Sequence, residues 1–329
     1  MKRDWSKGAG DAPVSLQCGA GLIELMLANA LSLAVLLMAL ALLQRFNADF
    51  IRHEQTMLLE ENSRYAIDLL TRAIRQAGYV DYGVATSGGP NPTIAGPAIS
   101  IRGADNSGLQ GSWSGFDPLP GRSVNGSDIL AVHFVGAGLV ADGSMINCAG
   151  FAVVSSGANT NAPDQGWSIF HVAEGVGGEP ELRCKYQGST KWDSQAIVRG
   201  VESFQVLYGL DIDGDGSVNQ YVSASAIHAL DAADPLADGS YWHAVRVIKI
   251  GLMLRTSRAV QASVWPDQFD LFGPHYSQAN GKHDIGSSIS LASLPADSHQ
   301  RLRLVIEATI FVRNTLFAPV ARCAGVVCA

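Results

Sequence analysis

The chain has 329 residues, of which 47% are hydrophobic and 16% are charged, and its formal net charge is −7. This composition supplies enough apolar side chains for a folded core and excludes a chain that is disordered throughout. The negative balance excludes a general nucleic-acid-binding protein, because such a protein needs a basic surface that neutralises phosphates.

The first predicted element is an apolar run, Ala20–Leu43, with a single formal charge at Glu24. Its length is sufficient for a helix that crosses a bilayer. Residues 1–19 form a basic leader that should stay in the cytoplasm, so the chain after residue 43 is expected on the outer face of the inner membrane. A carboxylate in such a helix costs about 2.5–3.5 kcal/mol even on the milder scales and is therefore a functional candidate. Cleavage after Gly19 would create a partner for it, the new α-amino group of Ala20.

The letters "GAGLIELM" around this position resemble the type IV prepilin signal, in which a Gly precedes the cut and a Glu follows at mature position five. The resemblance implies that a prepilin peptidase cleaves after Gly19 and methylates Ala20. It also implies that Glu24 pairs with the amino terminus of a neighbouring subunit during assembly. The chain departs from the family at Ala20, where such proteins usually have Phe.

The helix is expected to continue beyond the membrane to residue 78, because no breaker interrupts the chain before Gly78. Apolar residues recur at roughly helical intervals and predict a face that packs on a sheet. These residues are Phe46, Phe50, Met57, Tyr65, Ile67, Leu70, Ile74 and Ala77.

Residues 79–329 are predicted to form a β-rich head on the periplasmic or extracellular side, because short apolar runs alternate with loops that contain many of the 35 glycines. Nine strands are predicted, and several alternate as half-buried antiparallel strands should, for example "VRVIKIGLML" in Ala244–Arg255. They are Ala98–Arg102, Asp128–Val135, Phe151–Val154, Ser168–Val172, Glu181–Tyr186, Ala196–Tyr208, Gln220–Ala224, Ala244–Arg255 and Arg301–Arg313.

Four cysteines lie in the head, Cys148, Cys184, Cys323 and Cys328, and a fifth, Cys18, lies in the leader. Removal of the leader would leave an even set in an oxidising compartment, which favours two disulfides. Proximity along the chain favours Cys148–Cys184 and Cys323–Cys328 among the three pairings, and reduced structural thiols are the alternative.

The stretch "DIDGDGSVN" places Asp211, Asp213 and Asp215 at the spacing of the first half of an EF-hand loop. Alternate carboxylates on a tight turn suit Ca²⁺. The twelfth position is Val222, however, so the usual bidentate Glu is missing, and a solvated hairpin turn is the favoured interpretation. No other cofactor is expected. The sequence has neither an HExxH zinc motif nor a GxSxG elbow, and no enzyme activity is predicted.

Several later segments extend the resemblance. "EENSRYAIDLLTRAIRQAGYVDYG" is similar to the corresponding stretch of PilW-type minor pilins. "VESFQVLYGLDIDGDGSVNQYVSA", "YWHAVRVIKIGLMLRTS" and "RLRLVIEATIFVRN" resemble later segments of that family in the same order. The resemblance implies an α+β, pilin-like fold in which a long N-terminal helix packs on an antiparallel β-sheet head with long loops.

It also implies a minor pilin that helps to initiate or cap a type IV pilus, first as a single-pass inner-membrane protein and then within the pilus. Its implied partners are other minor pilins, the major pilin, the prepilin peptidase and, at the tip, an adhesin. Two alternatives stay open at this point. One is a type II secretion pseudopilin, and the other is a membrane-anchored periplasmic binding or enzymatic domain.

Overall fold

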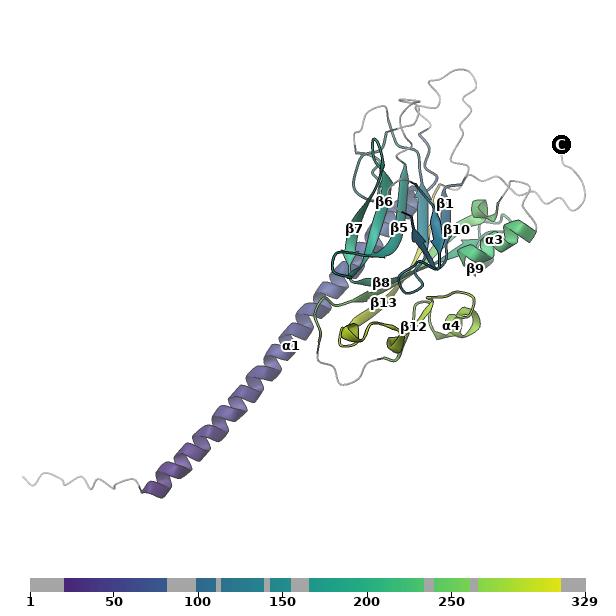
Figure 1. Cartoon of the computed structure of the whole chain (residues 1–329). Coiled ribbons are helices and arrows are strands. Elements are labelled where there is room, and N and C mark those ends of the chain that lie inside the picture. The colour runs from purple at the N-terminus through teal and green to yellow at the C-terminus, as the bar shows by residue number, and fades with distance from the viewer. Residues whose placement is uncertain are drawn as a thin grey trace, which may run out of the picture. The chain divides into compact units, whose positions relative to one another are not determined.

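The computed structural model describes residues 21–81, 99–110, 114–138, 143–154, 166–233, 240–260 and 266–314. The chain divides into two compact units, Met1–Ile51 and Arg52–Ala329. Helix α1, Leu22–Gln76, begins in the first unit and ends in the second (Figure 1). All strands that the structure describes lie in the second unit, which we call the head.

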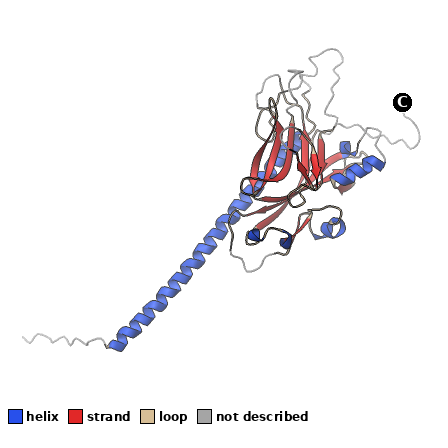
Figure 2. Ribbon diagram, in the orientation of Figure 1, coloured by secondary structure: helices blue, strands red, loops and turns tan. Residues whose placement is uncertain are grey.

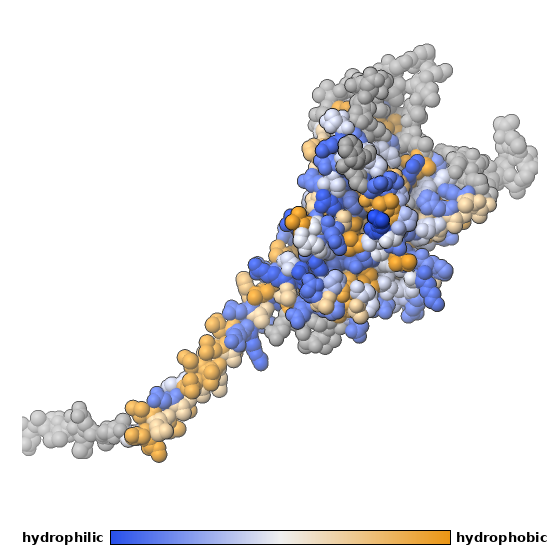
Figure 3. All heavy atoms as spheres, in the orientation of Figure 1, coloured by the Kyte–Doolittle hydropathy of each residue, from blue (hydrophilic) through white to orange (hydrophobic). Residues whose placement is uncertain are grey.

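Among the described helices, only α1 is long and apolar enough to cross a membrane. Its most apolar 18 residues have a mean hydropathy of 2.4. Its large apolar side chains are exposed from Leu22 to Leu43, and apolar atoms cover this part of the helix in Figure 3. Exposed apolar surface of this extent has no partner in water, whereas hydrocarbon would accommodate it.

The later part of α1 belongs to the head and buries one narrow face. That face repeats at intervals of three and four residues, as expected for a helix that packs along one side. Its buried members are Gln55, Leu59, Ser63, Ala66, Leu70, Ala73 and Ile74. The predicted face was therefore wrong at Phe46, Phe50, Met57 and Tyr65, whose side chains are 67%, 71%, 59% and 53% exposed. Small and polar residues occupy part of the buried face instead, a pattern that a search for large apolar residues misses.

The head contains two main antiparallel sheets (Figure 2). The five-stranded sheet has the order β1 (Ile101–Ala104), β4 (Ile129–His133), β5 (Trp167–Glu174), β6 (Pro180–Gln187) and β7 (Trp192–Arg199). The four-stranded sheet has the order β13 (Arg303–Phe311), β10 (Val245–Arg255), β8 (Val201–Leu210) and β9 (Gln220–Val222).

Smaller elements complete the head. Two short pairs are β2 (Ser107–Leu109) with β3 (Pro118–Pro120), and β11 (Gln268–Asp270) with β12 (Ser288–Ser290). The described helices besides α1 are α3 (Ala224–Ala233), α4 (Pro274–Asn280) and the 3₁₀ turns Tyr241–Ala244, Leu291–Ser293 and Ala296–Ser298.

One large apolar core joins α1 to both sheets. Leu70 and Ile74 of the helix are completely buried in it, together with Phe170 of β5 and Phe204 of β8. Because neither sheet could bury its inner face alone, the helix and the two sheets depend on one another for stability. The predicted α+β class, a long N-terminal apolar helix followed by an antiparallel sheet head, is confirmed.

The predicted strand Ala196–Tyr208 was wrong as a single element. Gly200 has a φ of +79° and divides it into β7 and β8, which belong to different sheets. A Cβ at this position would lie 2.7 Å from the carbonyl oxygen of Arg255, so glycine is required by both conformation and space.

Strand β10 also differs from its prediction as a half-buried strand. Ile248, Ile250 and Leu252 enter the main core, while Met253 packs with Phe269 in a second cluster on the opposite side. The segment that contains β11 and β12 covers this second face, which explains why almost every residue of β10 is buried.

Candidate functional site

Glu24 lies in the first turn of α1, where a carboxylate is favourable because the helix dipole is positive at that end. Its Oε2 atom accepts a hydrogen bond from the backbone N–H of Gly21 at 3.2 Å, and its own N–H donates to the carbonyl oxygen of Gly21 at 2.9 Å. The carboxylate therefore turns back toward the start of the helix. Gly21 directly follows Ala20, the predicted first residue of the mature chain, in the sequence. Gly19 and Ala20 themselves lie outside the described residues.

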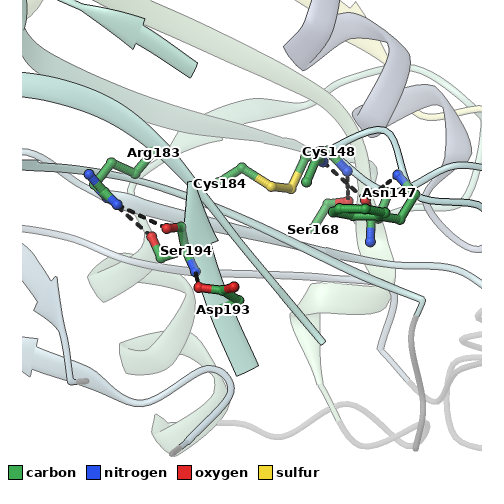
Figure 4. Close-up of a disulfide and its surroundings, with 9 residues drawn as sticks. Asn147, Cys148, Ser168, Arg183, Cys184, Asp193 and Ser194 are labelled. Atoms are coloured by element: carbon green, nitrogen blue, oxygen red, sulfur yellow. Dashed lines mark hydrogen bonds between the residues drawn. A yellow bond between two sulfur atoms is a disulfide. The ribbon is translucent and has the colours of Figure 1, made fainter. Parts of the chain in front are cut away.

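A disulfide joins Cys148 to Cys184, the pairing that proximity in the sequence favoured. Figure 4 shows that it ties the loop around Asn147 and Cys148 to strand β6. The N–H of Cys148 also donates to Ser168 Oγ at 3.0 Å, which fixes the same loop to β5. The second predicted pair, Cys323 and Cys328, falls outside the residues that the structure describes, as does Cys18.

Asp211, Asp213 and Asp215 come together in the loop between β8 and β9, and one ligand oxygen from each lies within 4.8 Å of the others. Asp211 is buried at the end of β8, whereas Asp213 and Asp215 are exposed. Asp211 accepts hydrogen bonds from the N–H groups of Gly214 and Gly216 at 2.8 and 3.1 Å. These bonds are those of a tight Asx turn, and they use carboxylate oxygens that a cation would otherwise bind.

A cationic partner of Asp211 is already present in the protein. Arg246 Nε lies 3.2 Å from Asp211 Oδ2, and only 12% of the arginine side chain is exposed. Burial raises the pKa of Asp211, but the hydrogen bonds from Arg246, Gly214 and Gly216 outweigh it, so the pKa stays below its usual value. The geometry thus gives Asp211 a structural role as the anchor of the turn and leaves Asp213 and Asp215 as solvent-facing acids.

A buried ionic network, which sequence analysis did not predict, connects three strands of the four-stranded sheet. Glu202 of β8 pairs with Arg303 of β13 at 2.6 Å and with Arg255 of β10 at 3.2 Å. Arg255 also pairs at 2.8 Å with Glu179, which precedes β6. Glu202 and Arg303 are each only 1% exposed at the side chain. The sequence contains one sign of this network, a glutamate within the apolar run "VESFQVLYGL". Because an unpaired charge in a core strand would be highly unfavourable, such a glutamate indicates a buried cationic partner.

Two buried aspartates were also missed. Asp128 accepts hydrogen bonds from the N–H groups of Asn106 and Val206, at 3.0 and 2.9 Å, and so links the two sheets. Asp284 accepts a bond from the Tyr276 hydroxyl at 2.8 Å. Burial, reinforced by the charge of Asp105, raises the pKa of Asp284 to about 6 and moves that of Asp128 in the same direction. Nothing in the local sequence distinguishes these acids from exposed ones.

A family model described as Type IV Pilus-assembly protein W, PilW, matches residues 169–314. This part of the chain is similar to the PilW family. It runs from β5 to the end of β13 and contains Cys184, the aspartate loop and the Glu202 network. The family description concerns pilus assembly, which is a structural role, and it names no reaction. Helix α1 precedes the PilW region in the chain and supplies the apolar segment that is consistent with membrane anchoring.

Among solved structures, a type IV-like pilin from Thermus thermophilus is similar to this chain. The two share 12% identity, and the match covers 78% of this chain and 98% of the other, with a TM-score of 0.37. No curated protein sequence matches the chain.

Proposed function

We propose that this protein is a minor pilin that helps to initiate or cap assembly of a type IV pilus. The observation that supports this most strongly is the combination, in one chain, of a PilW-like region with an N-terminal apolar helix that has a carboxylate in its first turn. The helix would enter the bundle at the pilus centre, and the head would contact other minor pilins and the major pilin.

Processing is the first step of the proposed function. A prepilin peptidase cuts after Gly19 and methylates Ala20, which removes the basic leader and leaves a charged amino terminus at the start of α1. Before assembly the protein is held in the inner membrane by α1, with its head in the periplasm. After assembly it is part of the pilus.

Glu24 then acts as the counter-charge that sets the register of the helix. An ammonium group buried in hydrocarbon without a partner costs several kcal/mol, so a helix that enters at the wrong depth leaves both its own acid and a neighbour's amine unpaired. The hydrogen bond from Gly21 supports this proposal, because the carboxylate faces the N-terminal end of the helix.

The test compares Glu24→Gln with Glu61→Gln, which changes an exposed glutamate in the part of the same helix that belongs to the head. We expect normal amounts of membrane-bound Glu24→Gln protein with Ala20 as its first residue, because lipid tolerates a neutral amide better than an acid. Its incorporation into sheared pili, measured by mass spectrometry, should fall by about tenfold or more, while Glu61→Gln should be incorporated normally.

Three results would contradict the proposal. Glu24→Gln protein in pili at the wild-type level would exclude the pairing mechanism. A mature chain that begins at Met1 in cells with active peptidase would exclude prepilin processing. Loss of protein secretion with intact pili, in a strain that lacks this protein, would favour the pseudopilin alternative.

A further inference from the structure

A pocket of about 520 Å³ lies beside the disulfide, between the turn around Asn147 and the hairpin that joins β6 to β7. Its volume falls within the range of small-molecule sites, about 300–1,000 Å³. The lining residues are Asn147, Phe151, Ala152, Tyr186, Gln187, Gly188, Ser189, Thr190, Lys191 and Asp193. None of the proposed roles in processing or helix pairing uses this part of the head.

An aromatic platform forms one wall. The rings of Phe151 and Tyr186 have centroids 5.2 Å apart and are tilted by 34°. Tyr186 is only 8% exposed and belongs to the core, whereas Phe151 is 54% exposed. A phenylalanine stabilises the fold by about 1.5–3 kcal/mol when it is fully buried. Because Phe151 is about half exposed, it forgoes much of this gain, and packing in the core does not explain its position. A flat, exposed aromatic ring at the edge of a pocket is suited to a ligand that has a flat apolar face.

The platform is held rigidly. The N–H of Asn147 donates to the carbonyl oxygen of Phe151 at 2.9 Å, and the N–H of Phe151 donates to Asn147 Oδ1 at 3.1 Å. The Cys148–Cys184 disulfide fastens this turn to β6, two residues before Tyr186 (Figure 4). The aromatic wall of the pocket is therefore fixed before any ligand arrives, which lowers the entropic cost of binding.

The remaining wall is polar and belongs to the β6–β7 hairpin. Ser189 and Thr190 have hydroxyl groups, Lys191 has an ammonium group and Asp193 has a carboxylate, and all four side chains are exposed. Asp193 Oδ1 accepts a hydrogen bond from the N–H of Ser194 at 2.8 Å, which orients the carboxylate. Such groups are the donors and acceptors that pair with hydroxyls. The charges of Lys191 and Asp193 cancel, so the wall as a whole does not favour an ionic ligand.

We propose that this pocket binds a neutral saccharide unit, such as one or two pyranose rings of a surface polysaccharide. The apolar C–H face of the ring stacks on Phe151, and its hydroxyls pair with Asp193, Lys191 and the hairpin hydroxyls. This combination of a flat apolar face with many hydroxyls matches both walls. A hydrophobic peptide would leave the polar wall unpaired, and an anionic ligand would meet Asp193.

The experiment uses the full-length chain in a zwitterionic detergent, because a detergent with a sugar head group would compete for the pocket. Saturation-transfer NMR and calorimetry are carried out with neutral di- and trisaccharides of hexoses and N-acetylhexosamines, with acidic oligosaccharides and an apolar peptide as alternatives. We expect at least one neutral saccharide to bind, with saturation transfer strongest at ring C–H protons. Phe151→Ala should weaken this binding by about tenfold or more, and Phe151→Trp should retain it.

Phe311→Ala is the matched control, because Phe311 is also exposed, at 67%, but lies on β13. It should bind as the wild type does, and the unfolding temperatures of both alanine variants should stay near the wild-type value. The proposal is overturned if no neutral saccharide binds at millimolar concentration, if Phe151→Ala binds equally well, or if the acidic sugar or the peptide binds more tightly. The outcome is independent of pilus incorporation, since the binding is measured on the isolated protein.

Discussion

Replacing Glu202 with Gln is expected to lower the free energy of unfolding of the head by about 3–5 kcal/mol. The side chain of Glu202 is 1% exposed, and its Oε2 atom accepts a hydrogen bond from Arg303 Nε at 2.6 Å. Its Oε1 atom accepts hydrogen bonds from Arg303 Nη2 at 3.1 Å and from Arg255 Nη1 at 3.2 Å. A neutral amide of the same shape cannot accept all three bonds and leaves Arg303 as a buried charge without the carboxylate that pairs with it.

The expected loss of stability is large because Arg303 is buried and would lose the carboxylate that neutralises it. Arg255 retains Glu179 as a second partner at 2.8 Å, whereas Arg303 has an ion pair with no acid other than Glu202 among the residues that the structure describes. For a unit of this size the loss corresponds to a decrease in Tm of roughly 6–10 °C. Glu307→Gln is the control, because Glu307 pairs with Lys249 at 2.7 Å on the same sheet while the two side chains are 38% and 27% exposed.

The assay is thermal and urea unfolding of the detergent-solubilised full-length chain, followed by tryptophan fluorescence. Glu307→Gln should change stability by about 0–1 kcal/mol, as expected for a partly exposed pair. A Glu202→Gln protein that unfolds within about 1 kcal/mol of the wild type would refute the reasoning. It would mean that solvent or a rearranged side chain compensates Arg303.

Three further predictions concern the head. Replacing both Cys148 and Cys184 with Ser should lower the free energy of unfolding, measured with urea, by about 4 kcal/mol, because the disulfide closes a loop with a sequence separation of 36. A decrease below about 1 kcal/mol would contradict this. Since burial raises the pKa of Asp284 to about 6, its ionisation destabilises the fold above that pH, so stability should increase as the pH falls from 7 toward 4. Asp284→Asn should flatten this dependence, and an unchanged slope would assign it to other groups. Millimolar Ca²⁺ should raise Tm by less than about 1 °C, because Arg246 already neutralises Asp211; a larger rise would identify a calcium site.

Patterns that depend on neighbours in the chain were readable from the sequence. The apolar run of α1 predicted its helix, because a long uninterrupted apolar segment has few alternatives. Cys148 and Cys184 were readable as a pair because only a few partners exist. Alternation in the β10 segment predicted a strand, and the order of the PilW-like segments predicted the family likeness of residues 169–314.

Elements whose limits are set by distant groups were misread. The predicted strand Gln220–Ala224 is cut short because α3 begins at Ala224. Asp105, 119 residues away in the chain, accepts hydrogen bonds from the N–H groups of Ala224 and Ser225 at 2.9 and 2.7 Å and so supplies the first turn of α3 with its cap. A capping residue so far away leaves no local signal.

The sequence by itself determined that this protein has an apolar N-terminal helix with one acid and an antiparallel β head, because both follow from composition and spacing along the chain. The PilW-like second half followed from the resemblance of its segments to that family. Only the tertiary structure decided which charges are buried and which aromatic ring is exposed. Glu202 and Asp213 are both acids in the same region of the sequence, yet one neutralises two arginines inside a sheet and the other faces water. Phe204 is completely buried while Phe151 is exposed at the rim of a pocket. The physical reason is that burial is set by segments that pack from far along the chain, and residue type and local spacing contain no information about which segments those are.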